Sequence, residues 1–287
     1  MRPVRLDTRG LVGLAEGPDE GRPLVMLHGF PDLPRGYVPL MERFAARGRR
    51  TVAPYLRGYA PSTTRGVTSL DVLTEDLLAW ADHLSPTEPI DAIGHDWGSV
   101  IVQRACLLRP ERFRRVVLMS VPHVLAFVEG VRREPAQLWR SRYMAHFQAG
   151  KLADVLVRAD RYRYVRDLWA RWSPSLRPDE DYLAELFACF DASWPAPLAF
   201  YRVAKKRGRW PVSMLGEPDL ARDSIGVPTL YLHGEEDGCV GPGLAEGQER
   251  YFTGEFTAKV LSGVGHFLHV EDPARVFDEA APFLERG

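Results

Sequence analysis

The segment "IGHDWGSV" contains an aspartate, Asp96, between glycines whose spacing is typical of a crowded turn from a strand into a helix. Gly94 and Gly98 lie two residues on either side of Asp96, and a turn of this kind presents a nucleophile. Aspartate, with a pKa of about 3.9, is anionic at neutral pH without the help of a base. Its carboxylate can displace a leaving group from a saturated carbon and form an ester that water can cleave, whereas serine would form an inert ether. The pattern therefore predicts displacement at carbon followed by hydrolysis, and the alternative is that Asp96 only caps the helix N-terminus.

A histidine after the last expected strand can supply the base that hydrolysis needs. We predict that His266, in "GVGHFLHVEDP", activates the attacking water. His269 competes for this role, but it falls at or beyond the end of the same loop. Two further histidines, His28 and His95, are most simply explained as hydrogen-bonded scaffold residues.

An acidic partner for this histidine follows the preceding strand. The segment "HGEEDGCV" offers Glu235, Glu236 and Asp237. Asp237 lies deepest in the turn, next to a glycine, and is therefore the predicted partner of His266. The order of Asp96, Asp237 and His266 along the chain matches the nucleophile, acid and histidine order of this type of site.

The turn "LHGFPD" after the first clear strand can direct backbone N–H groups toward the same site. We predict that the N–H groups of Phe30 and Trp97 form an oxyanion hole for the second step, when water attacks the ester. The frequency of X–Pro bonds favours a trans peptide between Phe30 and Pro31, with cis as the alternative. Phe30, Pro31, Trp97 and Phe147 are the residues predicted to line the substrate pocket.

Short apolar runs that end at glycine-bearing turns indicate strands buried on both faces of a sheet. A segment with helical periodicity, residues 70–84, lies between two of them. This alternation predicts a doubly wound, mostly parallel α/β sheet. The predicted strands are residues 23–29, 90–96, 114–121 and 228–234, with a further strand before His266.

The interval 122–222 interrupts this rhythm, because it contains helical and aromatic-rich segments without a buried-strand pattern. A structureless loop of that length is implausible in a compact domain, so we interpret it as a helical cap. The predicted organisation is a core from 1–121, a cap from 122–222 and the rest of the core from 223–287. Asp272 and Pro273 predict the N-terminus of the final helix.

The composition is that of an ordinary globular protein, with 287 residues, 45% hydrophobic, 26% charged and a formal net charge of −1. This charge gives no reason to expect nucleic acid or a membrane as a partner. The basic run at 205–209 is interpreted as a solvated helix end. The three cysteines have no metal-ligand spacing, and no signal peptide or apolar run of ~20 residues is present, so we expect free thiols and a cytoplasmic protein. The oligomeric state is unknown from the sequence.

Four motifs together resemble the α/β-hydrolase-fold epoxide hydrolases, and they are "HGFPD", "GHDWGS", "HGEEDG" and "GHFLHVEDP". The resemblance extends from about Leu24 to about Phe283 and includes the cap. It implies that an epoxide and water are the substrates and that a vicinal diol is the product. It implies neither a metal ion nor an organic cofactor.

The cap segments "YMAHFQ" and "PLAFYR" resemble those that carry the two ring-opening tyrosines of epoxide hydrolases. Carried over by position, these tyrosines are Tyr143 and Tyr201. The chain departs from the family at Ala149, where a proline commonly follows the Phe-Gln pair, and this leaves Tyr162 and Tyr164 as alternatives. Another interpretation is that the tyrosines only pack the interface between cap and core.

Haloalkane dehalogenases share the core motifs and are the alternative enzyme class. Trp97 resembles one of their halide-binding residues, but the position of their second donor, often asparagine, is Phe30 here. A cap tryptophan can replace that donor, and the candidates are Trp139, Trp169, Trp172 and Trp194. A non-catalytic ligand receptor of the same fold is a third class, although a receptor has no need of a complete triad.

Overall fold

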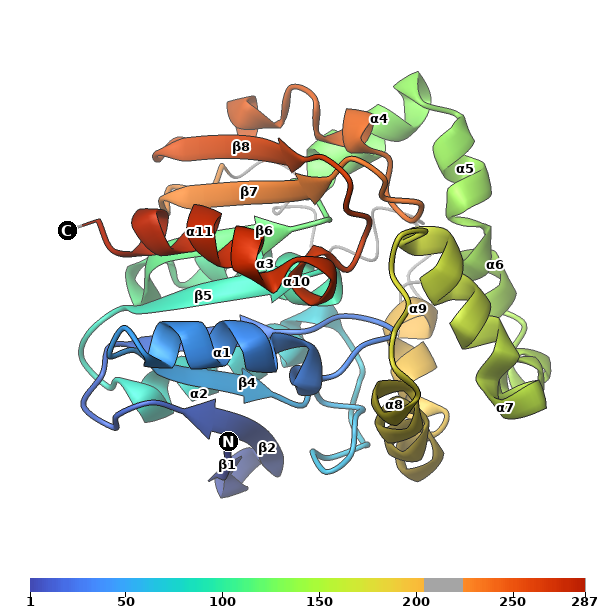
Figure 1. Cartoon of the computed structure of the whole chain (residues 1–287), viewed down its shortest axis with the longest axis horizontal. Helices are drawn as coiled ribbons and strands as arrows, with labels where there is room; N and C mark the ends of the chain where they lie inside the picture. Colours follow the sequence, from blue (N-terminus) through green and yellow to red (C-terminus); the bar gives the residue numbers. More distant parts are fainter. Residues whose placement is uncertain (204–223, 287) are drawn as a thin grey trace.

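The computed structural model describes residues 1–203 and 224–286. At its centre, these residues form one eight-stranded sheet with the strand order β1-β2-β4-β3-β5-β6-β7-β8 (Figure 1). The pairs β1–β2 and β2–β4 are antiparallel, and the other neighbours are parallel, so the predicted doubly wound, mostly parallel sheet is confirmed. The strands are β1 (Arg2–Leu6), β2 (Leu11–Glu16), β3 (Pro23–Leu27), β4 (Arg50–Pro54), β5 (Ile90–His95), β6 (Phe113–Met119), β7 (Thr229–Gly234) and β8 (Phe256–Leu261).

Helices cover both faces of this sheet. Figure 1 shows α1, α10 and α11 in front of the strands and α2 and α3 behind them. Side chains along β3 alternate between the two faces, because Leu24 and Met26 pack with α1 and α11, whereas Val25 and Leu27 pack with α2 and α3. The helices outside the cap are α1 (Val38–Ala45), α2 (Leu70–Leu84), α3 (Trp97–Leu108), α10 (Leu268–Glu271) and α11 (Pro273–Leu284).

Two of these helices begin where the sequence predicts, and each has a side-chain cap. α2 covers the predicted residues 70–84, and the Ser69 hydroxyl accepts a hydrogen bond from the Val72 N–H. At α11, the Asp272 carboxylate accepts from the Arg275 N–H at 2.9 Å, and a proline occupies the first turn.

Three strands, β1, β2 and β4, are absent from the sequence prediction. β1 lies at the edge of the sheet and is mostly exposed, so it lacks the continuous apolar run of a buried strand. β2 is interrupted by Gly13, and β4 ends at Pro54 after only two apolar residues. These strands pair with the sheet, but their sequences do not distinguish them from loops.

The described residues between β6 and β7 form helices and short turns. Figure 1 shows α5, α6, α7 and α8 beyond the carboxyl ends of the parallel strands, where a cap would lie. The basic run at 205–209 lies outside the described residues, and the boundaries at 121/122 and 222/223 stay predictions. The helices are α4 (Val124–Arg133), α5 (Ala136–Arg140), α6 (Arg142–Phe147), α7 (Lys151–Trp172), α8 (Glu180–Ser193) and α9 (Ala199–Val203).

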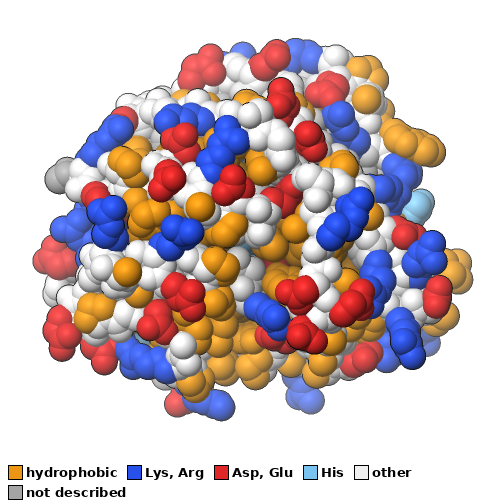
Figure 2. Space-filling view, viewed as in Figure 1, with side chains coloured by type: hydrophobic (Ala, Val, Ile, Leu, Met, Phe, Trp, Pro, Cys, Tyr) orange, Lys and Arg blue, Asp and Glu red, His pale blue; other side chains and the backbone are white. Residues whose placement is uncertain are grey.

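The visible surface carries lysine and arginine side chains interspersed with aspartate and glutamate, without a large area of one sign (Figure 2). None of the helices in residues 1–203 and 224–286 is both long and apolar enough to cross a membrane. Cys106, Cys189 and Cys239 are buried and form no disulfide bond, as predicted.

Candidate active site

Asp96 occupies the turn between β5 and α3, at a φ of 51° that non-glycine residues rarely adopt. The flanking glycines are required by close backbone approach. A Cβ atom at Gly94 would lie 2.4 Å from the Gly98 carbonyl oxygen, and one at Gly98 would lie 2.0 Å from the Leu27 carbonyl oxygen. The strained turn therefore holds the Asp96 side chain above the carboxyl end of the central strand.

The Asp96 carboxylate does not cap α3, so the capping interpretation is wrong. Its Oδ1 accepts a hydrogen bond from the Phe30 N–H at 2.8 Å, one of the two groups predicted for the oxyanion hole. The other, the Trp97 N–H, belongs to the first residue of α3 and therefore has no partner within the helix. The Phe30–Pro31 bond is cis, which is the alternative that the general frequency of X–Pro bonds does not favour.

His266 lies in the loop between β8 and α10 and is fully buried. Its Nδ1 donates to Asp237 Oδ2 at 2.8 Å. The second carboxylate oxygen of Asp237 accepts from the N–H groups of Cys239 and Val240, at 2.7 and 2.8 Å. Asp237 is thus held by its own turn with one oxygen directed at His266.

Glu235 and Glu236 are exposed, whereas Asp237 is buried, so the choice among the three carboxylates agrees with the structure. The position of Asp237 within the turn accounts for its burial. Asp237 points inward from the turn after β7, and its backbone N–H donates to the Gly234 carbonyl within that turn.

The other ring nitrogen of His266 faces Asp96, because Nε2 lies 3.7 Å from Asp96 Oδ2. The His266 carbonyl oxygen accepts hydrogen bonds from His95 Nε2 at 2.9 Å and Ser120 Oγ at 2.7 Å, which fixes the backbone of the loop. Burial by itself would lower the pKa of His266, but the carboxylates of Asp237 and Asp96 overcome this and raise it to about 10. His266 is therefore an imidazolium when both carboxylates are ionised.

The two scaffold histidines are hydrogen-bonded to the backbone as predicted. His28 Nδ1 donates to the Gly29 carbonyl at 2.8 Å, and His28 Nε2 accepts from the Leu56 N–H at 3.2 Å. Burial lowers the pKa of His28 to about 4, which keeps the ring neutral. His95 holds the loop of His266, as described above.

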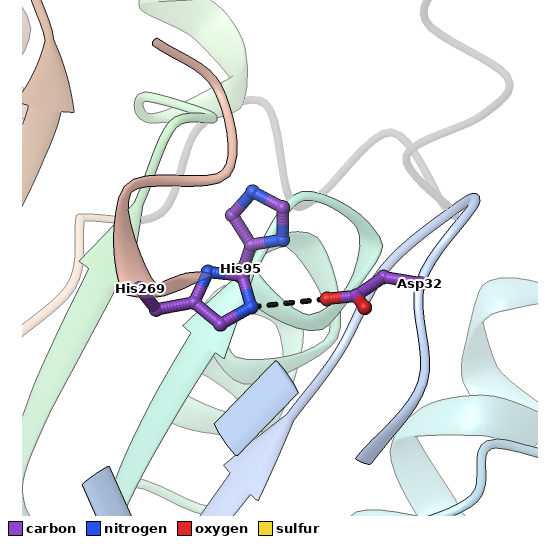
Figure 3. Close-up of side chains that lie close together, drawn as sticks. All are labelled: Asp32, His95 and His269. Atoms are coloured by element: carbon purple, nitrogen blue, oxygen red, sulfur yellow. Dashed lines mark hydrogen bonds and ion pairs between the residues drawn. The ribbon is translucent and has the colours of Figure 1, made fainter. Parts of the chain in front are cut away.

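His269 and Asp32 form a second histidine–carboxylate pair (Figure 3). His269 Nε2 donates to Asp32 Oδ2 at 3.0 Å, and the neighbouring ring of His95 completes a fully buried group of three possible metal ligands. Asp32 Oδ1 also accepts from the Leu33 N–H and the Tyr182 hydroxyl. These hydrogen bonds use both carboxylate oxygens, so they account for the cluster as a structural network. His269 lies in α10, past the loop, as the sequence predicts.

Tyr143 of α6 and Tyr201 of α9 lie close together, with ring centroids 5.7 Å apart, and both line a cavity that also contains Asp96. Tyr201 Oη has no hydrogen-bond partner among the described residues, and Tyr143 Oη lies 3.6 Å from Cys239 Sγ. Burial raises the pKa of both phenols well above the usual value. The two hydroxyl groups are therefore neutral donors in the cavity that Asp96 lines.

The alternative tyrosines lie elsewhere. Tyr162 donates to Asp191 at 2.7 Å, and Tyr164 Oη bonds to the exposed His146 at 2.8 Å. Neither contributes to the wall of the cavity.

The four cap tryptophans proposed as halide donors do not line the cavity either. Trp139 is 70% exposed, and Trp169 Nε1 donates to the Pro31 carbonyl oxygen at 2.8 Å. Trp172 packs against His266, and Trp194 packs against Tyr162.

The cavity beside Asp96 has a volume of about 150 Å³. Of the four residues predicted to line the substrate pocket, Trp97 does so. Phe30, Pro31 and Phe147 do not, and this corrects the prediction. Phe30 and Phe147 are fully buried and pack against one another, with ring centroids 5.3 Å apart.

The sequence analysis missed the residues that form most of the cavity wall. Four of them, Val124, Phe127, Val128 and Val131, lie on α4. Their spacing of three, four and seven residues is the signal that could have identified this apolar face. What the spacing does not indicate is whether the face meets another helix or an open cavity.

The fold and the site geometry agree with comparisons to known proteins. The family model for the α/β hydrolase fold matches residues 22–273. The chain belongs to the α/β-hydrolase fold family. The strand order and the Asp96 turn described above are those of an α/β-hydrolase core with an acidic residue at the nucleophile position.

Curated relatives of this α/β hydrolase include epoxide hydrolases, in agreement with the resemblance seen in the motifs. Epoxide hydrolase A of Mycobacterium tuberculosis is 27% identical, over 97% of this chain and 96% of its own length. Epoxide hydrolase 4 of Mus musculus is also 27% identical, over 89% of this chain and 71% of its own length. A crystal structure of Bacillus megaterium epoxide hydrolase, with an inhibitor, matches with a TM-score of 0.83 at 22% identity over 99% of this chain and 100% of that chain. This structural likeness shows the fold.

Proposed function

We propose that the protein is an epoxide hydrolase that opens an epoxide to a vicinal diol through an ester of Asp96. The observation that carries the proposal is the placement of Asp96, Tyr143 and Tyr201 around one cavity. A carboxylate and two neutral phenols are the groups that ring opening requires, since one attacks carbon while the others protonate the departing oxygen. The named relatives support the same reaction.

In the first step, the Asp96 carboxylate attacks an epoxide carbon, and the C–O bond of the ring breaks. The ring oxygen becomes an alkoxide and takes a proton from a tyrosine hydroxyl. Because burial raises the pKa of both phenols well above 10, the tyrosinate then regains a proton from the His266 imidazolium, whose pKa is about 10. His266 is left neutral.

In the second step, neutral His266 removes a proton from water, and the hydroxide attacks the carboxyl carbon of the Asp96 ester. Esterification removes the charge of Asp96, one of the causes that raise the pKa of His266 in the free enzyme. The Phe30 N–H, which already bonds to Asp96 Oδ1, and the Trp97 N–H stabilise the oxyanion. When the intermediate collapses, the bond between the carboxyl carbon and the substrate oxygen breaks, and the proton of the added hydroxyl passes to the departing alkoxide, which leaves as the diol. Asp96 is again a carboxylate and His266 is again protonated, as at the start of the cycle.

The decisive experiment separates the two steps. In the variant His266→Gln, alkylation should continue while hydrolysis stops. Intact-mass and peptide mass spectrometry should find one added epoxide on Asp96. The variant Asp96→Asn serves as the control and should show no adduct. An adduct on another residue, or full turnover by His266→Gln, would contradict the assigned roles.

The tyrosines distinguish epoxide opening from dehalogenation, because a departing halide needs no proton. Tyr143→Phe and Tyr201→Phe should each slow pre-steady-state alkylation by an epoxide, and the double variant should lose most of the roughly 10²–10⁴-fold contribution of general-acid catalysis. Circular dichroism controls for folding. Unchanged alkylation by the double variant would refute the ring-opening role. Faster release of halide from alkyl halides than of diol from epoxides would identify a dehalogenase.

A receptor of the same fold would bind epoxides without repeated turnover. The wild-type protein, without any partner, should release many equivalents of diol per chain. If it binds epoxides and never releases diol, the receptor class replaces the enzyme.

A further inference from the structure

Asp237 has a second histidine near the oxygen that it directs at His266. His233 of β7 is fully buried, and its Nε2 lies 3.6 Å from Asp237 Oδ2, the oxygen that accepts from His266 at 2.8 Å. A separation of 3.6 Å is too long for a hydrogen bond, so the hydrogen bonds of His233 lie elsewhere. The two steps proposed above leave this buried histidine without a role.

The hydrogen bonds of His233 fix the position of its proton. Nε2 bonds to the Val240 carbonyl oxygen at 3.0 Å, and Nδ1 bonds to the Tyr231 hydroxyl. Burial lowers the pKa of His233, which keeps the ring neutral with one N–H group. A carbonyl oxygen can only accept, so the hydrogen is on Nε2, and Nδ1 accepts from the Tyr231 hydroxyl. Tyr231 therefore selects the tautomer in which His233 donates to Val240.

Through Val240, His233 closes the turn that orients Asp237. The Val240 N–H donates to Asp237 Oδ1 at 2.8 Å, while the Val240 carbonyl oxygen accepts from His233. Val240 is thus held at both of its backbone polar groups. A shift of Val240 would move the N–H that holds Oδ1, and it would therefore turn Oδ2 away from His266.

The bond from His233 to Val240 ties this turn to the sheet. Asp237 follows β7 and His266 follows β8, and these strands are parallel neighbours (Figure 1). The strand pair is therefore the frame within which the acid and the histidine must be aligned. Gln137 of α5 also holds the turn, at one carbonyl oxygen and one N–H group, but its bonds tie the turn to α5 rather than to the sheet.

We propose that His233, oriented by Tyr231, is a positioning residue for hydrolysis of the Asp96 ester. It keeps Asp237 Oδ2 directed at His266 by holding the turn between them. This inference rests on the epoxide-hydrolase function proposed above and concerns its second step. Asp237 acts through His266 in that step, whereas alkylation depends on the Asp96 carboxylate and the two tyrosines. A change at His233 should therefore slow the loss of the ester and leave its formation nearly unchanged.

Two substitutions of His233 test the proposal. His233→Leu is close in size but removes the donor to Val240, whereas the side-chain amide in His233→Gln can still donate to that carbonyl. Single-turnover mixing with styrene oxide, followed by mass spectrometry, measures the formation and the decay of the Asp96 adduct. In His233→Leu, adduct decay should slow by roughly 10–100-fold, while adduct formation should change by less than about threefold. His233→Gln should recover most of the decay rate.

Leu232→Ala is the matched control for a general weakening of β7. Leu232 is the neighbouring residue and is fully buried, and its side chain points to the face of the sheet opposite to those of Tyr231 and His233. This variant should lower the free energy of unfolding and leave the ratio of the two rates at the wild-type value. Equal slowing of both steps in His233→Leu, or no recovery in His233→Gln, would overturn the positioning role.

If His233→Leu does not fold, Tyr231→Phe takes its place, because it removes one hydroxyl and leaves the His233 ring. Without the Tyr231 donor, the hydrogen of His233 can move from Nε2 to Nδ1, and the bond to Val240 is then lost in part of the molecules. Adduct decay should again slow more than adduct formation. Wild-type rates for both steps, or equal slowing of both, would contradict the proposal.

A measurement without substrate distinguishes this proposal from the proposed function. The hydrogen-bonded proton between His266 Nδ1 and Asp237 should give a downfield proton NMR signal that is absent from His266→Gln. In His233→Leu this signal should shift or broaden, and in His233→Gln it should return toward its wild-type position. If no epoxide forms an adduct on Asp96, the epoxide-hydrolase function is wrong, and the NMR signal still decides whether His233 positions Asp237. If adducts form and decay at the wild-type rate in a folded His233→Leu variant, the function stands and the positioning role is wrong.

Discussion

Two buried histidine–aspartate pairs, whose histidines are three positions apart in the sequence, both contact the His95 ring. His266 pairs with Asp237 at 2.8 Å, and His269 pairs with Asp32 at 3.0 Å. The centroid of the His95 ring is 4.8 Å from that of His266 and 4.5 Å from that of His269. By residue type, burial and hydrogen-bond length the pairs are nearly equivalent.

They differ in what the second nitrogen of each ring faces. His266 Nε2 lies 3.7 Å from Asp96 Oδ2, next to the cavity. His269 Nδ1 is buried without a hydrogen-bond partner among residues 1–203 and 224–286, and the His269 ring stacks on Tyr37 with centroids 4.6 Å apart. A bound carboxylate orients a histidine, but only a free nitrogen directed at the reacting atoms makes it a base. The first pair is therefore expected to act in hydrolysis and the second to stabilise the fold.

The largest effect is expected from Asp237→Asn. The asparagine carbonyl oxygen would keep the hydrogen bonds from the Cys239 and Val240 N–H groups, which turns its NH₂ group toward His266 Nδ1. His266 would then carry its proton on Nε2 and could not accept one from water. Diol release should fall by roughly 10²–10⁴-fold. Steady-state kinetics and persistence of the Asp96 adduct measure this effect. Unchanged turnover would contradict the role of Asp237 as the partner of His266.

The next effect concerns pH and the stability of the fold. The pKa of His266 is about 10 in the folded protein and near 6.5 in the unfolded chain, so the folded state retains a proton that the unfolded state releases. The stabilisation is complete below pH 6.5 and is lost as the pH rises through about 10. It amounts to at most about 5 kcal/mol, since one pKa unit corresponds to about 1.4 kcal/mol.

Denaturant unfolding between pH 6 and 10.5 measures this dependence, with His266→Gln as the comparison. The difference in unfolding free energy between wild type and variant should shrink as the pH rises. A difference that is constant over this range would show that His266 does not hold its proton in the folded state.

A smaller effect is expected from Asp32→Asn in the second pair. Removing this carboxylate weakens the hydrogen bonds from His269 and Tyr182 in a buried site, and the free energy of unfolding should fall by about 1–3 kcal/mol. The activation free energy of turnover should change by less than about 1 kcal/mol, or about fivefold in rate. Chemical denaturation and steady-state kinetics on the same sample test both statements. A loss of turnover as large as that of Asp237→Asn, in a folded protein, would end the distinction between the pairs.

The smallest effects are expected from Glu235→Gln and Glu236→Gln. These carboxylates precede Asp237 but are exposed, so each change should alter the free energy of unfolding by no more than about 0.5 kcal/mol. Turnover should stay at the wild-type level. A strong loss of turnover in either variant would show that Asp237 is not the only carboxylate of this turn that acts on His266.

Much of the site is predictable because its signals are local. The glycines around Asp96 follow from the crowding of one turn, and the buried strands next to it have continuous apolar runs. The edge strand β1 is not predictable in this way, because it is mostly exposed and is defined by its pairing with β2. The pocket is also not predictable, since Phe30 and Phe147 have the same apolar character as the residues of α4 that line the cavity.

The sequence alone determined the glycine-flanked turn at Asp96, the order of Asp96, Asp237 and His266 along the chain, and much of the alternation of strands and helices, because each depends on residues a few positions apart. The tertiary structure decided which histidine faces Asp96, which tyrosines share its cavity and which helix lines that cavity. These outcomes depend on contacts between distant segments, such as Asp237 with His266 and Phe30 with Asp96. Packing selects among chemically equivalent side chains by what surrounds them, and local sequence patterns do not contain that information.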